Sequence, residues 1–98
     1  MSQLRSQFTG VLTESGVIFD KPCKLVGWTA RVTSDSTIQI YKGVEAGEDS
    51  EIISEIDILA TDKSGGVMGI NGESTEGLYL KITGNARVCA YFQNLIKG

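Results

Sequence analysis

The residues with the most potential for chemistry are the carboxylates of one polar stretch, residues 43–51. Glu45, Glu48, Asp49 and Glu51 could supply oxygen ligands to a calcium ion. Their spacing does not match the D-x-[DN]-x-[DN]-G pattern of a calcium-binding loop, and this favours a solvated acidic loop. We therefore predict no metal site and no cofactor.

A glycine-rich stretch at residues 65–72 resembles a phosphate-binding loop in composition alone. Neither a Lys-Ser or Lys-Thr pair nor a helix start follows it, so a turn-rich connection is the better interpretation. Catalysis by a serine also lacks support, because the chain has no histidine and no S-x-x-K motif to supply a base. We predict a structural or binding module rather than an enzyme.

The composition is that of a single globular domain, with 98 residues, 41% of them hydrophobic and 21% charged. Nine basic and twelve acidic residues give a net charge of −3. This balance excludes the basic footprint of a nucleic-acid-binding protein and disfavours a membrane surface as partner. Cys23 and Cys89 show no CxxC spacing, and residues 1–10 do not resemble an export signal, so we predict two free thiols.

Short runs that alternate apolar and polar residues, separated by glycine and small polar residues, dominate the chain. The clearest run is residues 23–34, where Trp28 is expected to anchor the core. Gly27 within this run indicates a bulge or a close approach of another backbone. The residues expected on its core face are Val26, Trp28, Ala30 and Val32.

The other strands are predicted over residues 16–19, 37–42, 52–59, 67–70, 77–83 and 86–93. Residues 52–59 also fit a helical stripe, but their four isoleucines favour a strand, because branching at Cβ suits a pleated surface. The short links at residues 34–36 and Gly84-Asn85 predict two β-hairpins, each joining the runs on either side.

About seven to eight short strands and no convincing helix predict an all-β chain, folded as an antiparallel β-sandwich or jelly roll. Residues 16–98 then form a single β-sandwich domain. Residues 1–15 are polar and weakly patterned, which predicts an extended N-terminal arm or an edge strand.

Three tyrosines on outward registers, Tyr41, Tyr79 and Tyr91, are candidates for a shared interface patch. Tyrosine suits an interface because it offers a large contact area at a low entropic cost. The alternative is that the three are scattered over the sheet surfaces. Leu4 and Phe8 are further interface candidates, in an arm that would order only against a partner.

Three segments together resemble a group of small β-sandwich proteins of tailed bacteriophages. They are GVIFDKPCKLVGWTARVTSDSTIQIYKG, SGGVMGINGES and EGLYLKITGNARVCAYF, and the likeness covers roughly residues 16–92. The group shows a P-x-x-L-x-G strand, a T-(I/L)-x-(I/L)-Y-(D/K)-G segment and a G-(L/I)-Y-(V/L)-x-(I/V)-T-G strand. The acidic residues 43–55 depart from its pattern, being longer and more polar.

The resemblance implies a virion component assembled in the host cytoplasm, most often a head decoration (cement) protein. Its partner would then be the major capsid protein or another virion protein, and a homo-oligomer, a trimer first, is expected. The alternative is a tail or fibre accessory that binds host-surface carbohydrate. For that function, Tyr41 with Gln39 and Tyr91 with Gln93 are the candidate residues.

Overall fold

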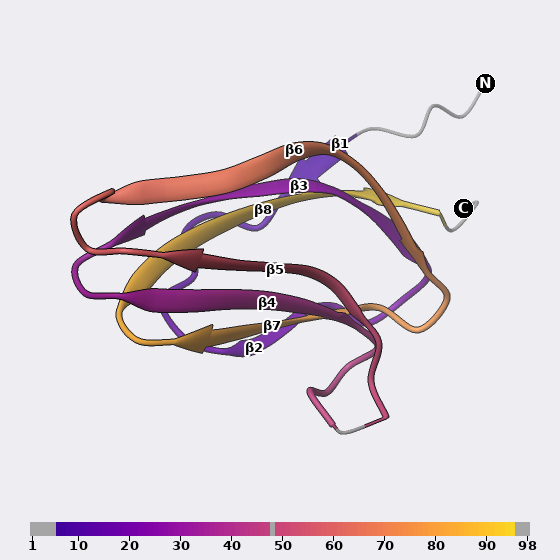
Figure 1. Cartoon of the computed structure of the whole chain (residues 1–98). Helices are drawn as coiled ribbons and strands as arrows, with labels where there is room; N and C mark the ends of the chain where they lie inside the picture. The colour runs from indigo at the N-terminus through magenta and orange to yellow at the C-terminus, as the bar shows by residue number, and fades with distance from the viewer. Residues whose placement is uncertain (1–5, 48, 96–98) are drawn as a thin grey trace.

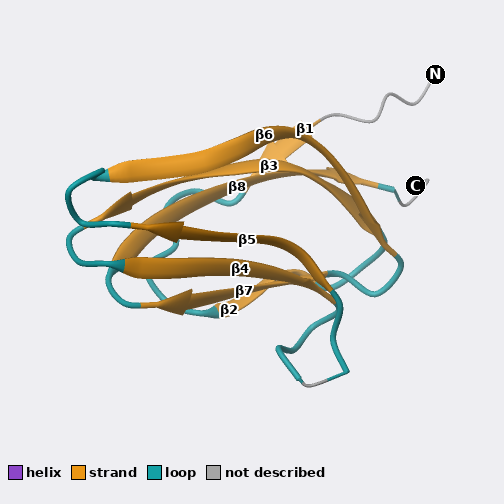
Figure 2. Cartoon of the chain, viewed as in Figure 1, coloured by secondary structure: helices purple, strands orange, loops and turns teal. Residues whose placement is uncertain are grey.

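The computed structural model describes residues 6–47 and 49–95, and this part of the chain is all β (Figure 2). Of the ambiguous residues 52–59, all but the last form a strand, as predicted. No helix long and apolar enough to cross a bilayer occurs among the described residues. The strands are β1 (Ser6–Phe8), β2 (Gly16–Phe19), β3 (Cys23–Val32), β4 (Ser36–Lys42), β5 (Ile52–Ile58), β6 (Ser64–Ser74), β7 (Leu78–Thr83) and β8 (Ala86–Asn94).

The strands form two antiparallel sheets that pack face to face (Figure 1). Sheet A has the strand order β1-β8-β3-β6, and sheet B has the order β2-β7-β4-β5. The pairings are nested, because β4 pairs with β5, β3 with β6, β2 with β7 and β1 with β8. A long hairpin rolled up in this way is a jelly roll. The prediction of an antiparallel sandwich of jelly-roll type is confirmed.

Both β-hairpins predicted from the short links are wrong. The link after β3 leads from sheet A to sheet B, and the link Gly84-Asn85 leads back from sheet B to sheet A. Among the described strands, only β4 and β5 are consecutive and paired with each other. Alternation reports which face of a strand is buried, and two strands facing each other across a core satisfy it as well as two strands side by side.

The two crossing links are packed against each other. The amide of Thr33 donates to the carbonyl oxygen of Asn85 at 3.2 Å. The hydroxyl of Ser36 lies 2.9 Å from the carbonyl oxygen of Ser34 and 3.2 Å from that of Asn85. Gly84 has a φ of +106°, and a Cβ there would lie 2.5 Å from the Ser36 hydroxyl. A glycine is therefore required at this turn by both its conformation and its packing.

Trp28 of β3 is among the largest fully buried side chains of the core, as predicted. Its indole Nε1–H donates to Oγ of Ser54 on β5 at 2.9 Å, so this hydrogen bond joins the two sheets through the core. No buried side-chain nitrogen or oxygen among the described residues lacks a partner. The other fully buried large side chains are Cys23, Leu25, Ile38, Ile40, Leu78, Leu80 and Val88.

A β-bulge in β3 changes which residues of its first half face the core. The register shifts between Leu25 and Gly27 against both neighbouring strands. Cys23 and Leu25 are therefore fully buried, whereas Val26, predicted to face inward, is only half-buried. The close approach predicted at Gly27 is confirmed, because a Cβ there would lie 2.5 Å from a backbone oxygen of β6.

The N-terminal segment joins the edge of sheet A. Residues Ser6–Phe8 pair with the C-terminal part of β8. The amide of Leu12 then donates to the carbonyl of Val88 at 2.7 Å, and the amide of Val88 donates back at 2.8 Å. Of the two structures expected for this segment, the edge strand is the one observed. An arm that orders only against a partner is wrong for the described residues from 6 onward.

Candidate interaction surface

The outer face of sheet B carries a row of large side chains that crosses all four strands. Val17 of β2 is paired with Tyr79 of β7. Tyr79 is also paired with Tyr41 of β4, and Tyr41 is paired with Ile52 of β5. Paired residues on neighbouring strands point to the same face and lie within contact distance. These four residues are called the apolar row below.

The apolar row is covered in its middle and open at both ends. Tyr41 is only 7% exposed and Tyr79 is half-buried, whereas Val17 and Ile52 are 49% and 42% exposed. A single exposed aliphatic residue is ordinary on a protein surface. Val17 and Ile52 differ from such residues because the two tyrosines join them across one face of sheet B. The apolar row is therefore the best candidate for an interaction surface on this sheet.

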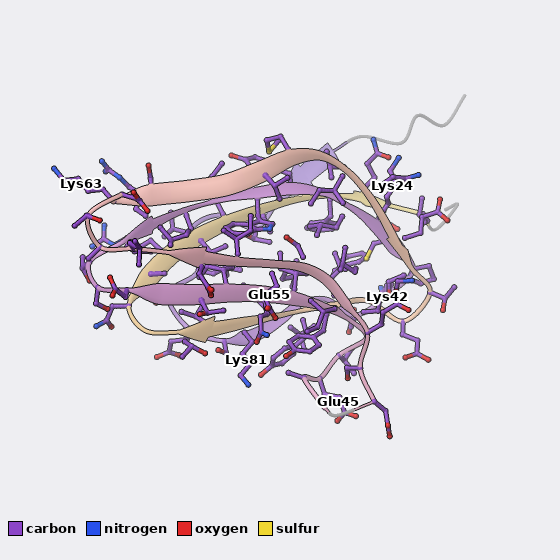
Figure 3. The ribbon with its side chains drawn as sticks, viewed as in Figure 1. Lys24, Lys42, Glu45, Glu55, Lys63 and Lys81 are labelled. Carbon is purple, nitrogen blue, oxygen red and sulfur yellow. The ribbon has the colours of Figure 1, made fainter. Side chains whose placement is uncertain are left out.

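Polar side chains next to the apolar row hold Tyr41 in place. Its hydroxyl donates to Oε1 of Gln39 at 3.1 Å, and Nε2 of Gln39 donates to Oε2 of Glu55 at 2.5 Å. Gln39 is also paired across the sheet with Lys81 on β7, and Figure 3 shows Glu55 and Lys81 at this part of the molecule. The face is thus divided into an apolar end and a hydrogen-bonded polar end.

The three tyrosines predicted to share a patch are divided between the two sheets. Tyr41 and Tyr79 are neighbours on sheet B, but Tyr91 lies on β8 of sheet A. A single patch of three tyrosines is therefore wrong, and only the pair on sheet B is brought together. Leu4 lies outside the described residues. Phe8 is placed by its backbone pairing with Tyr91 at the edge of sheet A.

Sequence reasoning did not single out Val17 and Ile52. Each stands in a short apolar run, and such a run does not say which strand lies beside it. The missing information is the order of the strands, because the apolar row exists only when β2, β7, β4 and β5 lie side by side. Nested pairing of the runs would have given that order and placed both residues beside the tyrosines.

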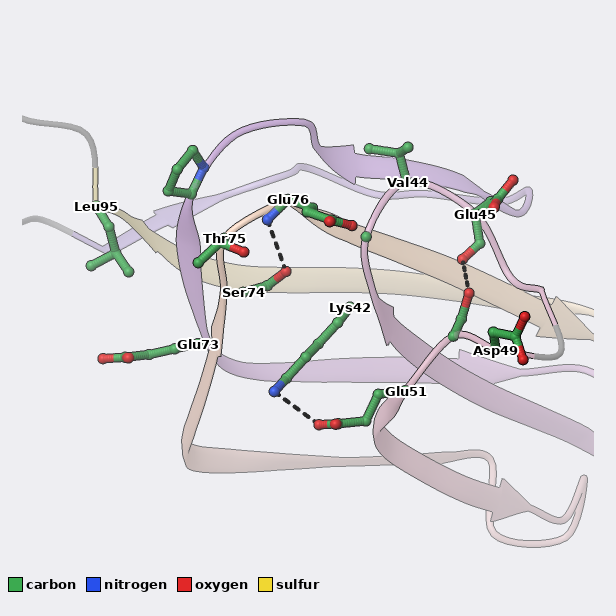
Figure 4. Close-up of a pocket in the computed structure, with 13 residues that line it drawn as sticks. Lys42, Val44, Glu45, Asp49, Glu51, Glu73, Ser74, Thr75, Glu76 and Leu95 are labelled. Atoms are coloured by element: carbon green, nitrogen blue, oxygen red, sulfur yellow. Dashed lines mark hydrogen bonds and ion pairs between the residues drawn. The ribbon is translucent and has the colours of Figure 1, made fainter.

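The acidic loop lies beside a hollow of about 690 Å³ at one end of the sandwich (Figure 4). Nζ of Lys42 and Oε2 of Glu51 form an ion pair at 2.8 Å, and Figure 4 shows Asp49 directed away from this pair. Glu45 also lines the hollow, while Glu48 lies outside the described residues. No three Asp, Glu, Cys or His side chains within residues 6–47 and 49–95 are grouped so as to hold a metal ion.

The two cysteines are free thiols, as predicted, and they lie on opposite faces of sheet A. Cys23 is buried in the core, whereas Cys89 is half-buried and paired with the outward-facing Thr29. Burial raises the pKa of the Cys23 thiol from 9.0 to about 11, because desolvation disfavours the thiolate. Cys23 therefore acts as a small apolar core residue.

Compared with models of known protein families and with the curated proteins, the chain matches none. The structure itself defines a class, that of small all-β jelly-roll proteins. Val17 and Ile52 are two of several exposed large apolar side chains among the described residues, and the apolar row joins these two across one sheet face.

Proposed function

We propose that the protein is a non-enzymatic structural protein of a bacteriophage virion, which binds the head shell as a decoration (cement) protein and stabilises it. The observation that carries this proposal is the apolar row, whose ends Val17 and Ile52 stay exposed on a jelly roll with a complete core. The resemblance of residues 16–92 to small phage β-sandwich proteins supports the biological setting.

The energetics of the apolar row suit attachment in many copies. Fully burying a valine or isoleucine side chain contributes about 1.5–3 kcal/mol relative to leaving it exposed. Val17 and Ile52 are each close to half exposed, so a partner gains roughly half of that from each residue. Such a contact is weak alone and becomes strong when linked copies bind together. A repetitive shell of capsid subunits offers that arrangement.

Two strands at sheet edges support self-association, and we take a homotrimer as the first assembly to test. β6 pairs only with β3, and β5 pairs only with β4, so each leaves one side without a hydrogen-bonded strand. Free strand edges favour pairing with another chain. A trimer would present three apolar rows to the shell at once.

The geometry is less favourable to carbohydrate binding on a tail or fibre. A sugar platform needs an exposed ring beside available hydrogen-bonding groups. Tyr41 is buried, and the amide of Gln39 already donates to Glu55, so this pair does not provide a platform. The other candidate pair, Tyr91 and Gln93, is half-buried on β8. Decoration of the shell is therefore the function that we retain.

The experiment is to count copies of the protein in particles purified from the phage that encodes it. A decoration protein should be present in a copy number comparable to that of the capsid subunits, and it should rebind saturably to shells from which it has been removed. A copy number of only a few per particle, confined to the tail fraction, would contradict the proposal. Light scattering of the isolated protein should give three times the protomer mass.

A further inference from the structure

A second hollow, of about 770 Å³, is lined by cationic and polar residues from several segments. It lies beside the links after β3 and β7 and the connection between β5 and β6, at the end of the sandwich where Figure 3 labels Lys63. None of the residues that line it is acidic. The charged and polar side chains among them are Arg31, Arg87, Lys63, Thr13, Thr33 and Asn85.

The two arginines stand directly opposite each other. Arg31 on β3 is paired with Arg87 on β8, and both side chains are exposed. Like charges at directly opposed positions destabilise a sheet. Neither arginine forms an ion pair with an acidic residue in the described part of the chain, although twelve of the 98 residues are acidic. The fold thus contains a like-charge pair in which neither arginine has an ion-pair partner among the described residues.

The backbone places a third cation beside this pair. Lys63 has a left-handed backbone, with φ of +64°, which is uncommon for a residue other than glycine. Its carbonyl oxygen accepts a hydrogen bond from the amide of Val32 at 2.8 Å, which ties the β5–β6 connection to the end of β3. Lys63 is held in this way at the rim of the same hollow as the arginines.

The geometry points to a binding site in this hollow for a phosphate or sulfate group. Guanidinium and ammonium groups only donate hydrogen bonds, so the ligand must supply acceptor oxygens and negative charge. Three cations on three segments match a doubly charged group with several oxygens better than a single carboxylate. Thr13, Thr33 and Asn85 line the same hollow, and their side chains carry further hydrogen-bond donors.

This inference does not depend on the proposed function, since the hollow and the apolar row use different residues. The test measures the melting temperature of the whole protein as inorganic phosphate is added, against sodium chloride of equal ionic strength. A ligand that binds only the folded state raises the melting temperature in proportion to the logarithm of its concentration. Phosphate should do this for the parent protein beyond the effect of chloride.

The matched variants are Arg31→Gln with Arg87→Gln, and Lys81→Gln as a control cation on the other sheet. Each arginine removed should weaken phosphate binding by about tenfold or more, because hydrogen bonds between charged groups are strong. Without phosphate, the double variant should melt above the parent because the like-charge pair is gone. Lys81→Gln should keep the full response to phosphate.

Two further arms identify the class of ligand. Inorganic sulfate and a sulfated polysaccharide should each stabilise the parent more than the double variant, which would support a site for the oxyanion group, free or on a polymer. Equal stabilisation of the parent by acetate at the same ionic strength would overturn the proposal. So would a phosphate response that is unchanged in the double variant.

Discussion

The buried layer between the sheets and the outer face of sheet B both contain large aromatic side chains whose polar atoms are satisfied. Trp28 donates to Ser54 inside the core, and Tyr41 donates to Gln39 on the outer face. The two regions differ in their aliphatic neighbours. Those of Trp28 are buried, whereas Val17 and Ile52 at the ends of the apolar row remain in contact with water.

This difference separates the residues that hold the fold from those available to a partner. Contacts within the chain complete the core, so truncating a core side chain should lower the free energy of unfolding. The ends of the apolar row contribute little to the fold, and burying them requires a second molecule. Substitutions in the core should therefore lower stability, whereas substitutions at the ends of the apolar row should lower binding and leave stability nearly unchanged.

The largest effect on stability is expected for Trp28→Ala. Truncating a buried aromatic side chain removes its transfer free energy and leaves a cavity, at a cost of about 3–5 kcal/mol. Urea denaturation followed by circular dichroism measures this loss, with Trp28→Phe as a milder variant if the alanine variant does not fold. A loss below about 1 kcal/mol would show that Trp28 is not an anchor of the core.

A smaller loss is expected for Ser54→Ala. This change leaves the Trp28 indole N–H buried without an acceptor, which costs about 1–3 kcal/mol. The exposed Ser64→Ala on β6 is the control and should stay within about 0.5 kcal/mol of the parent. In a double-mutant cycle, Trp28→Phe with Ser54→Ala should lower the free energy of unfolding by less than the sum of the two single changes. The reason is that the double variant leaves no buried donor without an acceptor. Additive costs would contradict a hydrogen bond across the core.

Alkaline pH should weaken the core through Cys23. The folded state raises the pKa of this thiol to about 11, so above pH 9.0 the unfolded chain loses a proton that the folded chain keeps. The stability that the buried, protonated Cys23 thiol contributes is fully present below pH 9.0 and is lost as the pH rises to about 11. The parent should therefore lose stability more steeply over this range than Cys23→Ala does. Parallel slopes for the two proteins would contradict the assignment.

The smallest effect on stability is expected for the pair Val17→Thr and Ile52→Thr at the ends of the apolar row. Threonine keeps the branching at Cβ that suits a strand, and both side chains are already exposed to solvent. Each change should alter the free energy of unfolding by no more than about 0.5 kcal/mol. A loss as large as that of Ser54→Ala would place these residues among those that hold the fold.

Most strands and inward faces could be predicted from the sequence, because alternation such as that of Ile38 and Ile40 reports burial directly. The interpretation of residues 65–72 as a turn-rich connection is wrong, because they lie within the long strand β6. Strand pairing could not be predicted, since the link Gly84-Asn85 is compatible with a hairpin as well as with a crossing between sheets. The bulge at Gly27 also shifted the core face onto Leu25, although the glycine itself was a visible signal.

The candidate surface was only half predictable for the same reason. The outward registers of Tyr41 and Tyr79 follow from their own strands. Their pairing with each other, and the addition of Val17 and Ile52, follow from the order of four strands that are distant in sequence. The separation of Tyr91 onto the other sheet has the same cause.

The most direct test of the account is the binding of the Val17→Thr, Ile52→Thr variant to shells stripped of the protein, measured by co-sedimentation. Val11→Thr is the matched control, because Val11 is an exposed valine outside the apolar row. The account predicts that the double variant, folded as well as the parent, binds at least about tenfold more weakly, and that the control binds normally. Binding of the double variant at the affinity of the parent would contradict the central claim that the apolar row is the docking surface.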